Sequence, residues 1–162
     1  MSEVYTQYIL KAMQGVFREY EIKELSTAVS EVSPQKYVET KGIDILVYFV
    51  QDLEGMVIIS TEEDTASTLA KKIDIDPENV TPETVREIMA EIGNLTAARA
   101  SGLFSNNGIE TNITPPSIFC GAGSQIYSMV PNLMITTMET EVGKIWLHSA
   151  IRRRHKHSVY LS

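Results

Sequence analysis

Apolar residues recur at helical spacing in two long stretches of the chain and a shorter one. The first predicted helix covers residues 4–20. The longest covers residues 81–103, where Thr81 serves as the N-cap and Pro82 fits the first turn, in which a missing N–H costs nothing. A shorter helix is predicted to begin at a capping box, Thr61-Glu62-Glu63-Asp64.

Apolar, β-branched runs predict the strands. Residues 43–50 and 56–60 form a hairpin signal, and their near-continuous hydrophobicity implies central strands covered on both faces. Residues 24–33 and 36–41, separated by Pro34, are polar enough to indicate one or two short edge strands. Further candidates are 109–113, 117–120, 125–130, 132–138 and a last strand from Gly143. Helix, strands, two helices and strands together predict an α+β layer fold with a mostly antiparallel sheet.

Composition narrows the class of protein. The 162 residues predict one domain, with 152–162 as a basic tail. A net charge of −7 argues against nonspecific binding to nucleic acid or to an anionic membrane, and no apolar run approaches the roughly 20 residues that span a bilayer. The single cysteine, Cys120, excludes an intrachain disulfide, and we expect it to be buried in a strand. These features predict a soluble cytoplasmic domain.

Common catalytic motifs are absent: the chain has no Gly-rich phosphate loop, no HExxH and no Gly-x-Ser-x-Gly elbow. His148 alternates with apolar residues, so we expect a hydrogen-bonded strand residue and not a general base. The basic residues 152–157 indicate a solvated strand end, the alternative being an anchor for an acidic partner. His155 and His157 there lack a third ligand that would complete a metal site.

The longest helix has three different sides. A mostly apolar, core-facing side carries Val85, Ile88, Met89, Ile92, Thr96, Arg99 and Leu103. A second side carries Glu83, Glu87, Glu91, Asn94, Ala98 and Ser101. The third has almost no side-chain bulk and consists of Ala90, Gly93, Ala97 and Ala100. Space is therefore cleared around one carboxylate and one amide, Glu91 and Asn94.

Glu91 and Asn94 are three residues apart, and so are adjacent on a helix. The Asn94 amide both donates and accepts hydrogen bonds, so it can hold a water, and Glu91 offers an acceptor for a cation on a partner. Phosphoryl transfer needs an in-line nucleophile and neutralised oxygens; a partner with the phosphoryl group, Mg²⁺ and a lysine would supply the latter. The small side would let the partner's backbone come close. The alternative is an exposed Glu and Asn on a helix that packs against another helix through that side.

The segment Glu91-Ile92-Gly93-Asn94-Leu95-Thr96-Ala97, followed about twenty residues later by Asn112-Ile113-Thr114-Pro115-Pro116, resembles the CheX branch of the CheC/CheX/FliY family of chemotaxis phosphatases. The resemblance runs from about Leu25 to Ile151. It implies a CheC-like fold, a long sheet packed by two long helices and a shorter one. It also implies hydrolysis of the aspartyl phosphate of a CheY-type response regulator. In that mechanism Glu91 pairs with the regulator's lysine, Asn94 orients the attacking water, and Pro115 or Pro116 shapes the segment near the helix.

The resemblance further implies a homodimer, and it places the Mg²⁺ in the regulator, so that the chain needs no cofactor of its own. Residues 4–20 lack a Glu-x-x-Asn pair, which favours one site per chain and the CheX branch. Glu87 departs from the Ser or Asp of the family motif and adds negative charge beside Glu91. The expected partner-binding residues are Glu87, Ala98, Pro115 and Pro116. The alternative function is a non-catalytic CheX-like module that binds a receiver domain or signalling partner.

Overall fold

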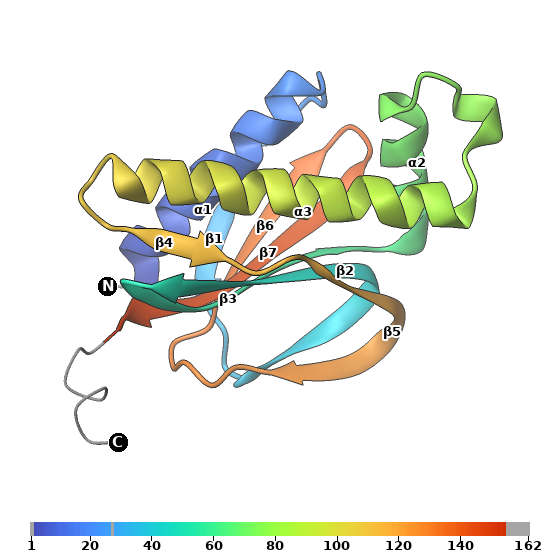
Figure 1. Cartoon of the computed structure of the whole chain (residues 1–162). Helices are drawn as coiled ribbons and strands as arrows, with labels where there is room; N and C mark the ends of the chain where they lie inside the picture. The colour runs from blue at the N-terminus through green and yellow to red at the C-terminus, as the bar shows by residue number, and fades with distance from the viewer. Residues whose placement is uncertain (1, 27, 155–162) are drawn as a thin grey trace.

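The computed structural model describes residues 2–26 and 28–154, which form one antiparallel seven-stranded sheet with three α-helices on one face (Figure 1). The helices are α1 (Ser2–Glu19), α2 (Glu63–Ile73) and α3 (Pro82–Ser105), with a 3-10 turn at Pro77–Asn79. The strands are β1 (Val29–Val32), β2 (Tyr37–Gln51), β3 (Leu53–Thr61), β4 (Thr111–Ile113), β5 (Ser117–Tyr127), β6 (Met134–Thr140) and β7 (Gly143–Arg153). Their order is β1-β6-β7-β3-β2-β4, and β5 also pairs with β2. The predicted α+β fold, with its mostly antiparallel sheet, is confirmed.

The main core lies between the helices and the sheet, and aromatic rings near the end of α3 hold that helix in place. Phe104 is fully buried, and its ring meets those of Tyr5, Tyr8 and Phe49 edge-on, with centroids 5.5–6.0 Å apart. Because these rings come from α1 and β2, the C-terminal half of α3 is fixed against both a helix and the sheet. Arg99 of α3 also forms an ion pair with Glu19 of α1.

Strand β2 changes partner along its length. From Tyr37 to Leu46 it pairs with β5, and from Phe49 to Gln51 it pairs with β4. The register shifts between Glu39 and Lys41, next to a bend at which the Asp44 carboxylate accepts hydrogen bonds from the backbone N–H groups of Lys41 and Gly42 at 3.0–3.2 Å. Beyond this bend, the first part of β2 and the end of β5 curl beneath the sheet (Figure 1).

The curled ribbon covers a second, smaller core on the face of the sheet away from the helices. Its buried members are Val38, Leu46, Met56, Ile58, Val130, Leu133 and Ala150. The central strands are thereby covered on both faces, as their continuous hydrophobicity predicted.

Two strand predictions were wrong because they divided the chain into more strands than it forms. Residues 36–41 belong mainly to the first part of the long β2 and are not a separate edge strand, because the bend at Gly42 lets the strand continue. Residues 117–120 and 125–127 are parts of a single strand, β5, in which Gly121 and Gly123 take positive φ values of 103° and 92°. An edge strand at residues 29–32 is confirmed as β1.

Two local predictions were also wrong. Thr61 does not cap α2: it is the last residue of β3, its Oγ1 donates to the carbonyl of Ile43, and Glu62 is an N-cap without a side-chain hydrogen bond. Cys120 is exposed and not buried: it lines a surface pocket together with residues of α2 and α3 and does not pack beneath them.

Candidate active site

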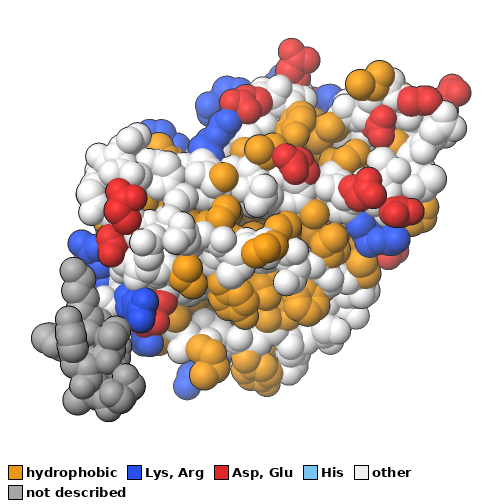
Figure 2. All heavy atoms as spheres, viewed as in Figure 1, with side chains coloured by type: hydrophobic (Ala, Val, Ile, Leu, Met, Phe, Trp, Pro, Cys, Tyr) orange, Lys and Arg blue, Asp and Glu red, His pale blue; other side chains and the backbone are white. Residues whose placement is uncertain are grey.

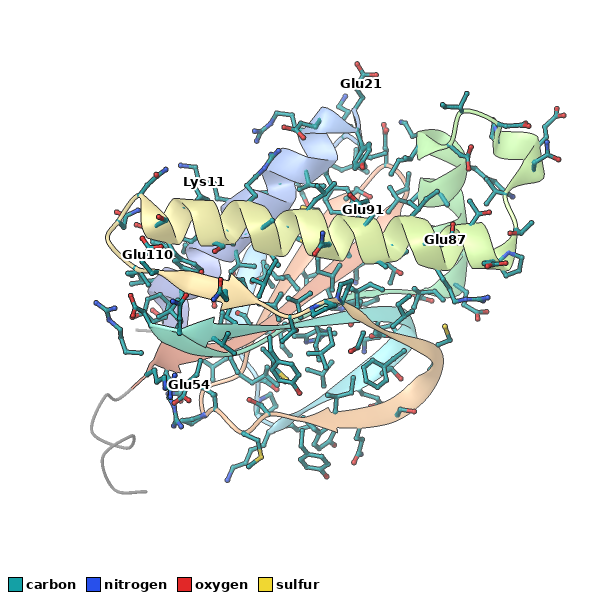
Figure 3. The ribbon with its side chains drawn as sticks, viewed as in Figure 1. Lys11, Glu21, Glu54, Glu87, Glu91 and Glu110 are labelled. Carbon is teal, nitrogen blue, oxygen red and sulfur yellow. The ribbon has the colours of Figure 1, made fainter. Side chains whose placement is uncertain are left out.

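Helix α3 presents its acidic side to solvent. Thr81 caps it as predicted, its Oγ1 accepting from the N–H of Thr84 at 3.2 Å. Glu87 and Glu91 are exposed and Asn94 is half-buried. Carboxylates stand along this helix in Figure 2, and Glu87 and Glu91 lie along its length in Figure 3. The sequence therefore predicted both the helix and the side on which these residues lie.

The small side of α3 faces the protein interior. Gly93, Ala97 and Ala100 are buried, and a Cβ built on Gly93 would overlap Cγ2 of Ile45 in β2. It is thus the sheet of the same chain that comes close to this side. The prediction that a partner's backbone would approach there was wrong, except that Ala90 lines an open groove.

That groove, about 540 Å³ in volume, lies between the acidic side of α3 and the segment that follows β4. Its lining residues are Glu87, Ala90, Glu91, Asn94, Ile113, Thr114, Pro115, Pro116 and Ile118. Five of the six predicted site residues are therefore brought together. The sixth, Ala98, is exposed one turn beyond Asn94 and does not line the groove.

Hydrogen bonds fix the second wall of the groove. The backbone N–H of Tyr48 donates to Oγ1 of Thr114 at 3.0 Å, and the N–H of Thr114 donates to the carbonyl of Tyr48 at 3.0 Å. Thr114 thus continues the pairing with β2 past the end of β4. On the other side of β4, the Ser101 hydroxyl of α3 lies 2.6 Å from that of Thr111. Both walls are therefore tied to rigid elements.

Ile113 and Ile118 also line the groove, although no sequence motif predicted a role for either. Ile118 is 40 % exposed and pairs with Ile45, so its place in the groove depends on the alignment of β5 with β2. Residues so far apart in the chain carry no local signal of this pairing. Thr114 belongs to the Thr-Pro-Pro motif, but the family resemblance implied no role for it.

The groove has acidic, amide, hydroxyl and apolar groups, and none of its lining residues is basic. Within the described part of the chain, no side-chain hydrogen bond or ion pair occupies Glu91 or Asn94, so both are available to a ligand. Nor do the described residues place three His, Cys, Asp or Glu side chains where they would hold a metal ion. The arrangement is able to attract a cation and to hold a water beside it.

His148 lies outside this groove, in β7 opposite Ile58 of the second core. It is only 4 % exposed, and neither ring nitrogen has a hydrogen-bond partner among the described residues, so the prediction of a hydrogen-bonded histidine was wrong. Burial, together with the charge of Lys41, lowers the pKa of His148 to about 3. It is a neutral core residue, in agreement with the prediction that it is not a general base.

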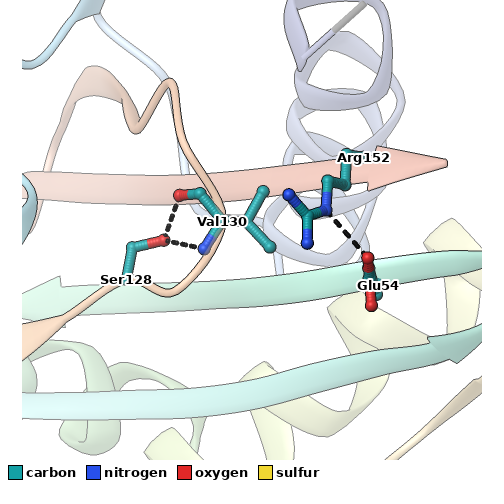
Figure 4. Close-up of polar contacts among 4 residues, drawn as sticks. All are labelled: Glu54, Ser128, Val130 and Arg152. Carbon is teal, nitrogen blue, oxygen red and sulfur yellow. Dashed lines mark hydrogen bonds and ion pairs between the residues drawn. The ribbon is translucent and has the colours of Figure 1, made fainter. Parts of the chain in front are cut away.

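The basic tail begins beside this second face. Arg152 Nε donates to Glu54 Oε1 of β3 at 2.8 Å, close to the turn in which Ser128 bonds both backbone groups of Val130 (Figure 4). Its first arginine is thus paired within the chain. Arg153 ends β7, and the backbone N–H of Arg154 donates to the carbonyl of Asp52 at 2.9 Å. Residues 155–162, with His155 and His157, lie outside the described residues.

Comparisons with known proteins agree with this fold. A family profile described as chemotaxis phosphatase CheX matches residues 43–137. A CheX structure from Desulfovibrio desulfuricans has a TM-score of 0.81 at 13% identity, covering 91% of this chain and 99% of that one. CheX from Vibrio vulnificus gives 0.73 at 17% identity, covering 91% and 96%.

A CheX–CheY–BeF3–Mg²⁺ complex from Borrelia burgdorferi gives a TM-score of 0.69 at 23% identity, covering 92% of this chain and 98% of that one. No curated protein sequence matches the chain. None of the helices in the described residues has the length and apolar character needed to cross a membrane. The family profile covers more than half of the sequence, and the chain belongs to the CheX family of chemotaxis phosphatases.

Proposed function

We propose that this protein hydrolyses the aspartyl phosphate of a CheY-type response regulator in the cytoplasm. The observation that carries the proposal is a pair of side chains, Glu91 and Asn94, that lie beside each other on α3, line a groove and have no partner among the described residues. The Borrelia burgdorferi CheX crystallised with CheY supports the choice of partner.

In the proposed reaction, Asn94 orients the attacking water. Its amide oxygen accepts from the water, or its NH₂ group donates to it, without a charge that would trap it. The water oxygen attacks phosphorus as the bond to the aspartyl oxygen breaks, which yields the free carboxylate, inorganic phosphate and a proton. Because phosphoryl transfer depends on positioning and charge neutralisation, one oriented water is a sufficient contribution from this chain.

Glu91 is proposed to pair with the active-site lysine of the regulator. Its exposed carboxylate has no partner among the described residues, so pairing breaks no existing interaction. The regulator supplies the Mg²⁺ in this proposal, and this chain supplies no cofactor. Glu87, Ala98, Pro115 and Pro116 are proposed to contact the regulator, with Glu87 favouring a basic rim on it.

The test is phosphate release from a panel of phosphorylated receivers. We expect the protein to shorten the phosphoryl lifetime of its cognate receiver, and we expect Asn94→Ala to abolish this while binding persists. Asn106→Ala, in an exposed residue at the end of the same helix, is the matched control and should stay active. A receiver that binds with an unchanged phosphoryl lifetime would favour the alternative, a non-catalytic receiver-binding module.

We also propose that the protein is a homodimer. Strand β5 supports this, because its 11 residues carry no charged side chain, most are exposed, and among the described strands it pairs only with β2. Such an uncharged edge favours pairing with another strand. Light scattering should give twice the mass of one chain for the wild type. Ala122→Lys should reduce the measured mass to that of a single chain. A monomeric wild-type protein at micromolar concentration would contradict this proposal.

A further inference from the structure

Gly93 lies between the two proposed site residues in the sequence but faces the opposite way, onto β2. It is buried on the side of α3 that faces the sheet, and a Cβ at this position would overlap Cγ2 of Ile45 and lie 3.3 Å from the Cβ of Ile45. Ile45 is itself 1 % exposed. Because a β-branched side chain in a packed sheet has few alternative rotamers, Ile45 cannot turn its methyl group away at low cost.

Ile45 also supports the other wall of the groove. It pairs with Ile59 of β3 on one side and with Ile118 of β5 on the other, and Ile118 lines the groove. The residue on which Gly93 rests is thus part of the same strand register that places the far wall. The distance between α3 and β2 at this point therefore affects the width of the groove.

The other inward positions of α3 differ from Gly93. Ala97 and Ala100 face inward with a methyl group each, and Gly102, elsewhere in the helix, has no atom within 4 Å of a built Cβ. A glycine inside a helix is unfavourable relative to alanine. At Gly93 the close approach to the sheet is the structural reason for tolerating that cost.

We infer that the missing side chain at Gly93 sets the height of α3 above β2 and so places Asn94 opposite Thr114–Pro116. Gly93 is then a positioning residue for the reaction, an inference that rests on the proposed function. An added methyl group requires a displacement of about 1 Å, since ordinary contact begins at 3.4 Å. Misplacing a positioned group by about 1 Å costs on the order of 100-fold in rate.

The experiment compares Gly93→Ala with Gly102→Ala, which adds the same methyl group to the same helix without a contact. Dephosphorylation of the cognate receiver gives kcat and KM for each variant, and crystal structures give the separation of Asn94 and Thr114. We expect kcat of Gly93→Ala to fall about 10- to 100-fold with KM nearly unchanged, because the exposed docking residues remain. We expect α3 to be displaced in that variant alone.

A rescue separates positioning from general destabilisation. Ile45→Ala removes the methyl group that Gly93→Ala would strike, although the core then loses more atoms. In the Ile45→Ala background, the added methyl group should therefore lower kcat much less than the roughly 10- to 100-fold expected in the wild type. Ile45→Ala alone is the reference for this comparison. A Gly93→Ala variant as active as Gly102→Ala, or a loss of kcat in the Ile45→Ala background as large as in the wild type, would overturn the inference.

The same experiment distinguishes the inference from the proposed function. If the wild-type protein fails to speed dephosphorylation of any receiver, the proposed function is wrong, and the crystal structures still decide the role of Gly93. An undisplaced α3 in Gly93→Ala then refutes the inference, and a displaced α3 with a changed separation of Asn94 and Thr114 supports it.

Discussion

Replacing His148 by leucine should make the stability of the protein less sensitive to acid. The imidazole is 4 % exposed between Ile58 of β3 and Ile135 of β6, and its pKa falls from 6.5 to about 3, chiefly through burial. The folded protein therefore keeps His148 neutral at a pH at which the unfolded chain protonates it. Between pH 6.5 and 3 the unfolded state binds the additional proton, so the free energy of unfolding falls as the pH falls.

The size of the effect follows from the shift. Each unit below the unfolded pKa costs about 1.4 kcal/mol, so lowering the pH from 7.5 to 5.0 costs about 2 kcal/mol from His148 alone. Asp44 acts in the opposite sense, because burial raises the pKa of its carboxyl and the folded state takes up that proton more readily. Since Asp44 is present in both proteins, its contribution cancels in the difference between wild type and His148→Leu.

Urea unfolding at pH 7.5 and 5.0, followed by the fluorescence of the single tryptophan, Trp146, measures this difference. The wild type should lose about 2 kcal/mol more than His148→Leu. At pH 7.5 the variant should be at least as stable, because an unbonded buried polar group costs about 1–3 kcal/mol and leucine has none. Equal losses in the two proteins would show that His148 takes up its proton in the folded state and would refute the reasoning.

Three further predictions concern the site and its support. Thr114→Val removes the acceptor for the N–H of Tyr48, so it should lower the free energy of unfolding by about 1 kcal/mol and also reduce phosphatase activity. If neither quantity changes, the role of this hydrogen bond is contradicted. Phe104→Ala should cost about 3–5 kcal/mol in urea unfolding, since the ring is fully buried; a loss below about 1 kcal/mol would argue against its central place in the core. Glu87→Ser introduces a residue of the family motif. It should raise KM for a basic receiver about threefold at low salt and by less at high salt, with kcat unchanged. A rise in KM that does not depend on salt would rule out a charge contact.

The sequence predicted the parts of the site that depend on local periodicity. Helical spacing was sufficient to place Glu91 and Asn94 on the exposed side of one helix, and the cap at Thr81 followed from residue type. The position of Pro115 and Pro116 beside that helix was expected only through the family resemblance. The structure brings these residues to one groove.

What the sequence did not predict depends on long-range pairing. The small residues Gly93, Ala97 and Ala100 predicted a side of the helix that a partner could approach. Small residues equally allow a helix to lie close to a sheet, and the contact of Gly93 with Ile45 shows that the sheet is the neighbour. Cys120 lies in an apolar run typical of a buried strand. Its exposure follows from the place of β5 beside β2, which no local pattern specifies.

Strand β2 contributes to both cores, so its residues have less freedom to change during evolution than exposed residues have. Ile45 must fit beneath α3, the backbone of Tyr48 must hold Thr114, and Asp44 must hold the bend toward the second core. A substitution in this strand therefore has to satisfy several neighbours at once. Exposed positions of α3 such as Glu87 have no such internal obligations. Divergence toward new receivers should accumulate on the outer side of that helix, while β2 changes slowly and in concert with the residues that it contacts.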